Sequence, residues 1–174
     1  MTRRLADLPL PEARPAPATG APSAWVSRGE RLAGHTPAER PAERGGPPLV
    51  LLADGDDVTV RVLRHRFERD GLAVAVVATG FDALTALRTT APAVALVNAA
   101  LVGEDGFEVL RRVRRGEAGP AALPVVMTCW AGNDALVVRA FALDADDVLV
   151  RPFSLAEASA RIRRLVRRAS GVRP

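Results

Sequence analysis

Charged and polar side chains follow three short apolar runs of the sequence, and these positions are the first candidates for chemistry. Asp54 and Asp56 come directly after the run Leu49–Ala53, Asn98 lies near the end of a second run, and Arg151 follows a third. Carboxylate oxygens are the ligands that hard cations prefer, and a carboxylate can act as an oxygen nucleophile. A side-chain amide is a far poorer nucleophile. These residue types favour cation binding by the carboxylates or an ion pair between a carboxylate and the guanidinium.

Cysteine and histidine offer little further chemistry. Cys129 is the only cysteine, so no intramolecular disulfide can form, and His35 and His65 have no metal-ligand partner at useful spacing. We expect Cys129 to be a buried apolar side chain rather than a redox sensor, because a sensor needs an exposed thiolate of low pKa. We expect His65 to be solvated, and we predict neither a metal site nor a cofactor.

Short apolar runs alternate with amphipathic segments from Pro48 onward, which predicts an α/β domain with a parallel sheet. Right-handed crossovers then place helices on both faces, and ligands bind at the carboxyl ends of the strands. The predicted strands are 49–53, 72–78, 93–99, 124–128 and 147–150. Apolar residues at helical spacing are Val58, Val62, Leu63 and Phe67; Ala83, Leu84 and Leu87; Phe107, Leu110 and Val113; and Leu136, Val137, Ala140 and Leu143.

The last predicted helix has the clearest start, because Ser154 followed by Glu157 makes a capping box. Its apolar face is formed by Leu155, Ala158, Ile162, Leu165 and Val166. Five strand and helix units then fit in one domain that covers residues 48–170. Residues 171–174 form a short C-terminal tail.

Residues 1–47 contain most of the prolines, with Ala, Arg, Glu and Gly between them. A segment of this composition buries too little apolar surface to offset its ordering entropy, so we predict a disordered tail. Trp25 and Val26 are its one apolar island. We interpret them as a stray aromatic in a flexible tail, with a short docking motif as the alternative.

The charge balance is less basic than the isoelectric point indicates. The formal net charge of the 174 residues is +4, while the sequence pI is about 11.0. All 24 basic residues are arginine, so almost nothing titrates between neutrality and the arginine pKa, and a small positive excess raises the pI strongly. No segment resembles a signal peptide or a membrane span of roughly 18 apolar residues. We therefore expect a cytoplasmic protein with no membrane association.

Four motifs stand in order at the ends of the predicted strands. They are Leu51-Leu52-Ala53-Asp54-Gly55-Asp56, then Leu96-Val97-Asn98 followed by Gly103-Glu104-Asp105-Gly106-Phe107, then 123–129, and finally 143–153. Together they resemble the receiver domain of bacterial response regulators across nearly all of residues 48–170. The resemblance implies a flavodoxin-like, doubly wound sheet of five parallel strands in the order 2-1-3-4-5, with helices on both faces, and a signalling role rather than an enzyme.

Several residues depart from the family at the phosphorylation site. In active receivers an aspartate at the end of the third strand accepts a phosphoryl group, and two acidic residues after the first strand hold magnesium. Here Asn98 has the acceptor position and Gly55 replaces the second acid, which leaves Asp54. We expect Asp56 to cap the next helix rather than substitute as a ligand. The family's lysine aligns with Arg151, which we expect to bond Asn98 and Asp54 and close the pocket, with anion binding as the alternative.

Three more positions concern the response to phosphate. The family's phosphate-sensing Ser or Thr aligns with Cys129, and Thr128 should point to the opposite side of its strand. The switch aromatic aligns with Val148, so the ring that reports phosphorylation is absent. Pro152 aligns with a proline that follows a cis bond in the family.

These departures predict an atypical receiver that acts in signal transduction through phosphorylation-independent protein contacts. The resemblance points to the face made by the helix near 136–143, the strand 147–150 and the last helix as the surface for a protein partner or a second copy. A solvated charged surface is the alternative. The charged residues expected on this face are Arg139, Asp146, Asp147, Glu157, Arg161 and Arg163.

Two other functions stay open. Arginines on the third and last helices would attract nucleic-acid phosphates. We do not expect this role, because the sequence has no stacking tyrosine and we expect no DNA-binding domain after residue 170. The degenerate pocket could instead hold a small molecule. The arginines of the nucleic-acid alternative are Arg111, Arg112, Arg114, Arg115, Arg161, Arg163, Arg164, Arg167 and Arg168.

Overall fold

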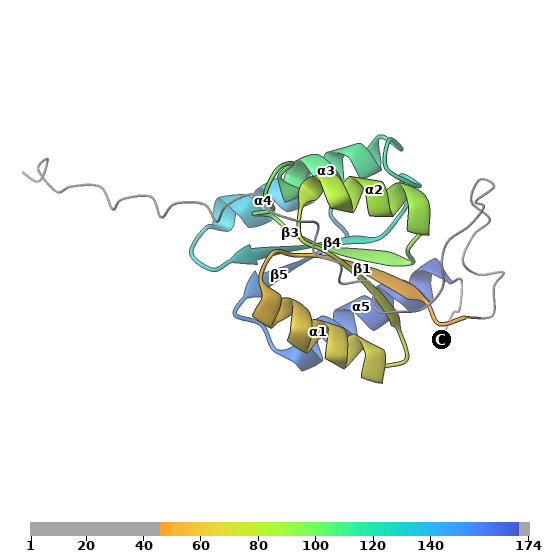
Figure 1. Cartoon of the computed structure of the whole chain (residues 1–174). Coiled ribbons are helices and arrows are strands. Elements are labelled where there is room, and N and C mark those ends of the chain that lie inside the picture. Colours follow the sequence, from red (N-terminus) through yellow and green to blue (C-terminus); the bar gives the residue numbers. More distant parts are fainter. Residues whose placement is uncertain (1–45, 171–174) are drawn as a thin grey trace, which may run out of the picture. The chain divides into compact units, whose positions relative to one another are not determined.

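Strands and helices alternate along residues 46–170, the part of the chain that the computed structural model describes (Figure 1). Residues 1–45 of the tail predicted at 1–47, including Trp25, Val26 and His35, and residues 171–174 lie outside the described residues. The strands are β1 (Leu49–Ala53), β2 (Ala73–Val77), β3 (Val94–Asn98), β4 (Val125–Trp130) and β5 (Asp147–Arg151). The helices are α1 (Asp57–Arg69), α2 (Gly80–Thr90), α3 (Gly106–Arg114), α4 (Asp134–Ala142) and α5 (Leu155–Ala169).

All neighbouring strands are parallel, and their order is β2-β1-β3-β4-β5. This confirms the flavodoxin-like order implied by the resemblance. Most strand ends lie within one residue of the prediction, and the largest difference is in β4, which continues to Trp130, two residues beyond its predicted end at 128. The extension is paired, since Cys129 and Trp130 lie opposite Val150 and Arg151 of β5.

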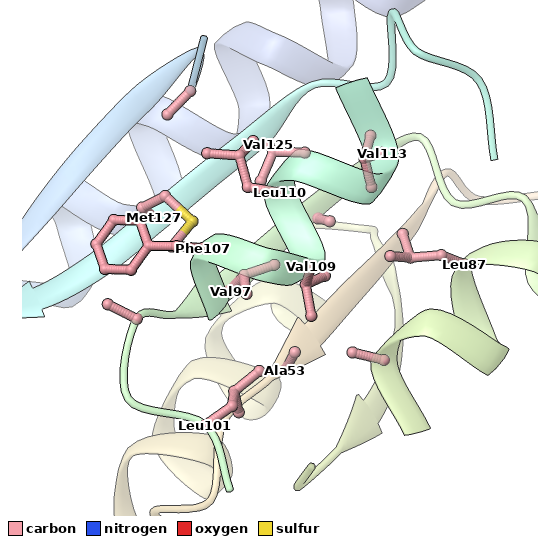
Figure 2. Packing of buried hydrophobic residues seen from close by; sticks show 14 of the residues in the cluster. Ala53, Leu87, Val97, Leu101, Phe107, Val109, Leu110, Val113, Val125 and Met127 are labelled. Carbon is pink, nitrogen blue, oxygen red and sulfur yellow. The ribbon is translucent and has the colours of Figure 1, made fainter. Parts of the chain in front are cut away.

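The helices form two layers, with α1 and α5 on one face of the sheet and α2, α3 and α4 on the other (Figure 1). Successive strand side chains point to opposite faces, so both layers cover apolar residues. Figure 2 shows the second layer, where Phe107, Leu110 and Val113 of α3 pack over Val125 and Met127. A fully buried side chain of this size contributes about 1.5–3 kcal/mol. No helix among residues 46–170 is long and apolar enough to cross a bilayer.

The helix starts agree with the local sequence. Ser154 caps α5 and accepts a hydrogen bond from the backbone N of Glu157 at 3.0 Å, as the capping signal predicted. Only some of the apolar residues at helical spacing in α1 lie in the core. Leu63 and Phe67 are buried, whereas Val58 is 69% exposed because it lies in the first turn at the solvent side.

Candidate functional site

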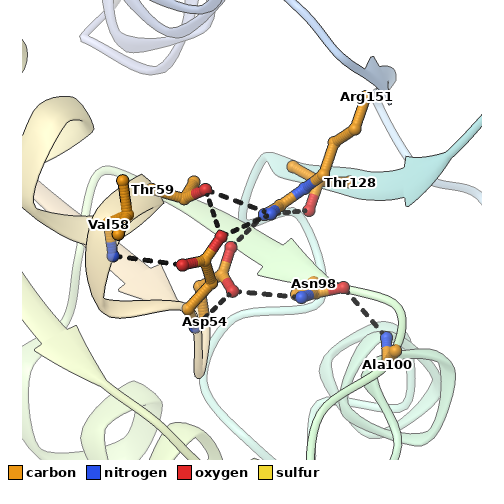
Figure 3. A network of polar contacts seen from close by, with 8 residues as sticks. Asp54, Val58, Thr59, Asn98, Ala100, Thr128 and Arg151 are labelled. Atoms are coloured by element: carbon orange, nitrogen blue, oxygen red, sulfur yellow. Dashed lines mark hydrogen bonds and ion pairs between the residues drawn. The ribbon is translucent and has the colours of Figure 1, made fainter.

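Four strands bring polar side chains together at their carboxyl ends (Figure 3). Asp54 follows β1, Asn98 ends β3, Thr128 lies near the end of β4, and Arg151 ends β5. Parallel strands place all their carboxyl ends at the same edge of the sheet, which is where such folds hold their sites. Residues that are far apart in the sequence therefore form one polar cluster, which we call the pocket.

A buried ion pair occupies the centre of this pocket. Nη2 of Arg151 donates to Oδ2 of Asp54, and only 5% and 2% of the two side chains are exposed. The same nitrogen donates to Oγ1 of Thr128 at 3.2 Å, and Nη1 donates to Oγ1 of Thr59 at 3.3 Å. Two buried charges compensate each other where water cannot, and the hydroxyls satisfy further guanidinium hydrogens. The predicted contact between Arg151 and Asp54 is present.

Asn98 takes part differently from the prediction. Its Nδ2 donates to Oδ1 of Asp54 at 3.0 Å, and its Oδ1 accepts from the backbone N of Ala100 at 3.0 Å (Figure 3). Within the described part of the chain, Arg151 makes no hydrogen bond to Asn98, so that part of the prediction is wrong. The reason is that Asn98 turns its amide nitrogen toward Asp54 and its oxygen toward Ala100, so the group next to the ion pair is a donor, and a donor cannot accept from the guanidinium.

Asp56 lies at the mouth of the pocket and caps α1, as predicted. It accepts from the backbone N of Val58 at 3.1 Å and from Oγ1 of Thr59 at 2.6 Å, and Arg151 lies 3.7 Å away. The hydrogen bond from Thr59 holds the pKa of Asp56 below its usual range, against the opposing effect of burial. Asp56 remains 44% exposed, so it borders the pocket without entering it.

Gly55 lacks a side chain, but there is space for one. A Cβ built there would meet only the backbone O of Ala78, at an ordinary 3.5 Å. The backbone at this position therefore does not require glycine. A Cβ could be accommodated at the position where the family has its second magnesium ligand.

Cys129 is separated from the ion pair by the sheet. It is 3% exposed and packs with Met127 and Val148 on the α2–α3–α4 side, while Thr128 points to the opposite side, as predicted. Burial raises the pKa of the Cys129 thiol, an effect that the nearby Arg151 charge only partly offsets. The thiol is therefore neutral and apolar in character. Val148 is likewise a buried core residue.

Two aromatic rings flank the guanidinium and were not predicted. Cζ of Arg151 lies 5.6 Å from the ring centroid of Trp130 and 5.8 Å from that of Phe153, distances that allow cation–π attraction. Trp130 itself is 61% exposed, and the bond between Arg151 and Pro152 is cis, as the resemblance implied. Trp130 escaped prediction because the expected strand ended before it.

Thr59 and Thr128 are the pocket residues that sequence reasoning missed or set aside. Thr59 follows Asp56 by three positions, the spacing of a helix cap, and this is the one local signal for it. Among residues 46–170, no group of three or more His, Cys, Asp or Glu side chains could hold a metal ion. The pocket contains a neutralised carboxylate, an amide and hydroxyls, with no free carboxylate at the end of β3.

The charged residues predicted for a protein interface form one cluster and three separate contacts. The cluster joins β5 to α5: Nη1 of Arg161 donates to Oδ1 of Asp147 at 2.6 Å, and its Nη2 donates to Glu157 at 2.8 Å. Arg164 also pairs with Asp147, at 3.2 Å, and was not predicted here. These charges satisfy one another within the chain.

The other three point elsewhere. Arg139 stacks over Phe107 of α3 at 4.1 Å, and Asp146 pairs with Arg114 of α3 at 2.8 Å. Arg163 lies near Asp70 at the end of α1, where its charge helps to lower the pKa of that carboxyl. A helix turns by about 100° per residue, so close sequence positions on α4 and α5 face different neighbours.

Apolar residues on the same side of the molecule were missed. Val138 and Phe141 of α4 are 67% and 51% exposed, and Val150 of β5 is 40% exposed. We call these residues, together with Asp147, Glu157 and Arg161, the α4–β5–α5 face. Its apolar residues are exposed and its charges are paired.

Comparison with known proteins adds the family. The model of the response regulator receiver domain matches residues 50–163. Transcriptional regulatory protein AfsQ1 of Streptomyces coelicolor is 36% identical over 121 residues, which cover 70% of this chain and 52% of the relative. Phosphate regulon transcriptional regulatory protein PhoB of Rhizobium meliloti is 32% identical over 123 residues, which cover 71% and 53%. The chain thus spans about half the length of these curated relatives.

Solved structures agree with the fold. A putative response regulator from Chloroflexus aurantiacus aligns with a TM-score of 0.64 and 27% identity, covering 69% of this chain and 98% of that one. The receiver domain of the Francisella response regulator 1452 aligns with a TM-score of 0.65 and 26% identity, covering 70% and 98%. The described part of the chain therefore has the size and topology of a whole receiver domain.

Proposed function

The chain belongs to the response regulator receiver domain family, and we propose that it is a receiver which signals through protein contacts without accepting phosphate. The family is a signalling module of two-component systems rather than a family of enzymes. The observation that carries the proposal is the buried ion pair of Arg151 and Asp54, with Asn98 bound to the same carboxylate. The polar side chains of the pocket therefore bond one another.

Phosphate acceptance lacks a nucleophile. Phosphoryl transfer needs an oxygen nucleophile in line with the phosphorus and cations that neutralise the developing charge. Asn98 presents an amide, whose Nδ2 donates to Asp54 and whose Oδ1 accepts from Ala100. The atom that would attack is therefore absent from the end of β3.

Magnesium binding would have to displace protein groups. Oδ2 of Asp54 accepts from Arg151, while its Oδ1 accepts from Asn98 and from the backbone N of Asp56 at 3.1 Å. A cation at this carboxylate would repel the fixed guanidinium, and Gly55 supplies no second acid. Both effects weaken a site that needs several oxygen ligands.

The α4–β5–α5 face is the proposed contact surface, and its partner is a second copy of the chain. Exposed Val138, Phe141 and Val150 give the apolar centre that protein interfaces need, and aromatic residues are frequent energetic centres of such interfaces. Paired charges at Asp147 and Arg161 form the rim. A surface that carries both signs can be self-complementary across a two-fold axis.

Intact-protein mass after incubation with acetyl phosphate and magnesium tests the pocket. We expect no phosphoryl adduct on the wild type or on Asn98→Asp, because both lack an acidic metal ligand at position 55 and both keep the fixed charge of Arg151. We expect an adduct on the triple variant Asn98→Asp, Gly55→Asp, Arg151→Lys, since a side chain fits at position 55. Stoichiometric phosphorylation of the wild type contradicts the proposal.

Analytical ultracentrifugation over a concentration series tests the face. We expect the wild type to dimerise reversibly and Phe141→Asp to be monomeric, because a carboxylate would be buried at the centre of the contact. Val102→Asp is the matched control, since Val102 is 73% exposed in the loop after β3, away from this face. A wild type that stays monomeric at every concentration contradicts the assignment of a second copy.

A further inference from the structure

Arginine side chains differ in their pairing between the two helix layers. On α3, Arg111, Arg112 and Arg114 pair with carboxylates, and Arg115 lies 3.8 Å from Glu117. On the opposite layer, several exposed arginines have no ion-pair partner among the described residues; they are Arg61, Arg69, Arg163, Arg167 and Arg168. We call these the α1–α5 arginines.

The local carboxylates on this layer are already engaged. Asp70, at the end of α1, pairs with Arg66 at 3.0 Å and accepts from Oγ of Ser159 at 2.5 Å, which ties α1 to α5. Glu68 pairs with Arg64 at 2.8 Å. The α1–α5 arginines therefore add to an excess of positive charge on two helices that lie side by side, although Arg163 lies near Asp70 and Asp57 stands four residues before Arg61 (Figure 1).

The spacing of these side chains suits a row of phosphates. Arg163 and Arg167 are four residues apart on α5, a separation of about 6 Å along the helix axis. Arg69 is in the last turn of α1, next to Asp70, which bonds Ser159 and lies near Arg163 of α5. A planar guanidinium binds phosphate oxygens with two parallel hydrogen bonds, so each side chain can contact one phosphate.

The surface around the last turns of α5 has no apolar centre, which favours a polyanion over a protein as its partner. The large exposed apolar residues of α1 and α5 are Val58, Val62 and Leu155, all in the first half of their helices among the described residues. Arg163, Arg167 and Arg168 lie in the last turns of α5. Protein interfaces have an apolar core, whereas nucleic-acid interfaces are polar and strongly positive.

We infer that the α1–α5 arginines form a docking surface for the phosphate backbone of nucleic acid, without sequence preference. The surface keeps Arg163, Arg167 and Arg168 from the arginines that the sequence indicated and excludes the α3 group, which pairs with Glu104, Glu108, Glu117 and Asp146. Arg163 lies on the side of α5 toward Asp70 of α1, whereas Arg168 follows Arg161 by seven residues and so lies on the side of α5 that takes part in the α4–β5–α5 face.

Fluorescence anisotropy with a labelled DNA duplex of arbitrary sequence tests this surface in the full chain. The logarithm of the binding constant should fall linearly with the logarithm of salt concentration, by about 0.9 per phosphate contact. Arg163→Gln with Arg167→Gln should reduce that slope by about 2 and weaken binding about tenfold or more at low salt. The matched control is Arg88→Gln with Arg115→Gln, the same charge change on the other layer, and its binding should match the wild type.

Three results would overturn the inference. The first is a wild type that does not bind the duplex at 50 mM salt, a concentration at which about five phosphate contacts give readily measured affinity. The second is an equal loss in the control variant, which would assign binding to total charge. The third is binding to vesicles of anionic lipid without binding to DNA. Circular dichroism of each variant shows that the fold is retained, and none of these outcomes depends on dimerisation or on phosphorylation.

Discussion

β5 has a charged residue at each end, and the two ion pairs they form differ in burial. Arg151, the last residue, pairs with Asp54, and the two side chains are 5% and 2% exposed. Asp147, the first residue, pairs with Arg161 and Arg164, which are 38% and 63% exposed. An ion pair of arginine with aspartate therefore lies in a closed pocket at one end of β5 and near an open surface at the other end.

The comparison shows that burial decides what an ion pair does. At the open end, water can solvate the exposed arginines when a pair separates, so each arginine contributes little to stability, although Asp147 itself is buried. At the closed end, each charge depends on the other, because water is excluded and removal of one leaves an uncompensated buried charge. The Arg151 pair therefore fixes the state of the pocket, while the Asp147 pairs join α5 to the sheet edge.

Removal of Arg151 should have the largest effect. Arg151→Met leaves the Asp54 carboxylate buried without a cation, so we expect the free energy of unfolding to fall by about 3–5 kcal/mol. Urea denaturation with constant m-value measures the change. Asp54→Leu combined with Arg151→Met should be much more stable than the single variant, because no charge remains buried. A double variant as unstable as the single one would show that packing, not charge, holds the pocket.

Asp147→Asn should have an intermediate effect. Asp147 is buried and accepts from two arginines, so its neutralisation should lower the free energy of unfolding by about 1–2 kcal/mol. Asp144→Asn is the matched control, because Asp144 is exposed, and asparagine tolerates its left-handed backbone (φ 61°). The control should change stability by less than about 0.5 kcal/mol. Equal losses of stability in the two variants would contradict the distinction between a buried and an exposed carboxylate.

Acid should weaken the contact between α1 and α5. Burial alone would raise the pKa of Asp70, but hydrogen bonds from Ser159 and Arg66 outweigh it and hold the pKa below its usual range. A carboxyl whose folded pKa is lowered stabilises the fold above its unfolded pKa, near 4, and this is lost as pH falls through the folded pKa. Thermal melting between pH 5 and pH 2, in about half-unit steps, should show a smaller decline in Asp70→Asn. An identical decline would assign the acid sensitivity to other carboxyls.

Arg161→Gln should have the smallest effect. Arg161 is 38% exposed and Arg164 still pairs with Asp147, so we expect a loss of about 0–1 kcal/mol that shrinks at high salt. Urea denaturation at low and high salt measures it. A loss comparable to that of Arg151→Met would mean that the open end of β5 behaves like the closed one.

Much of the fold follows from local sequence. Apolar runs at 49–53 and 147–150, and the cap at Ser154, predicted elements within a residue or so of those observed. The strand order came from the resemblance, because spacing alone does not order parallel strands. β4 extends further than expected, since Cys129 and Trp130 are paired by β5, and pairing partners cannot be read from one segment.

The sequence predicted which residues form the pocket better than it predicted the hydrogen bonds between them. Asp54, Asn98 and Arg151 come together because strand ends meet at one edge, which the topology dictates. Thr59 and Thr128 were missed as partners of Arg151, since the path of a long side chain depends on rotamers and packing from several elements. The sequence does not encode such contacts at any fixed spacing.

The space beside Gly55 bears on how a pocket of this kind could change over generations. A Cβ there makes only an ordinary contact with the backbone O of Ala78, so the backbone does not prevent the return of a second acid. The guanidinium of Arg151 does, because a new carboxylate would be drawn into its ion pair. The effect of a substitution at position 55 therefore depends on which residue is present at 151. Such epistasis orders the mutational path: position 151 has to change before acidic substitutions at 55 and 98 can be selected for metal binding.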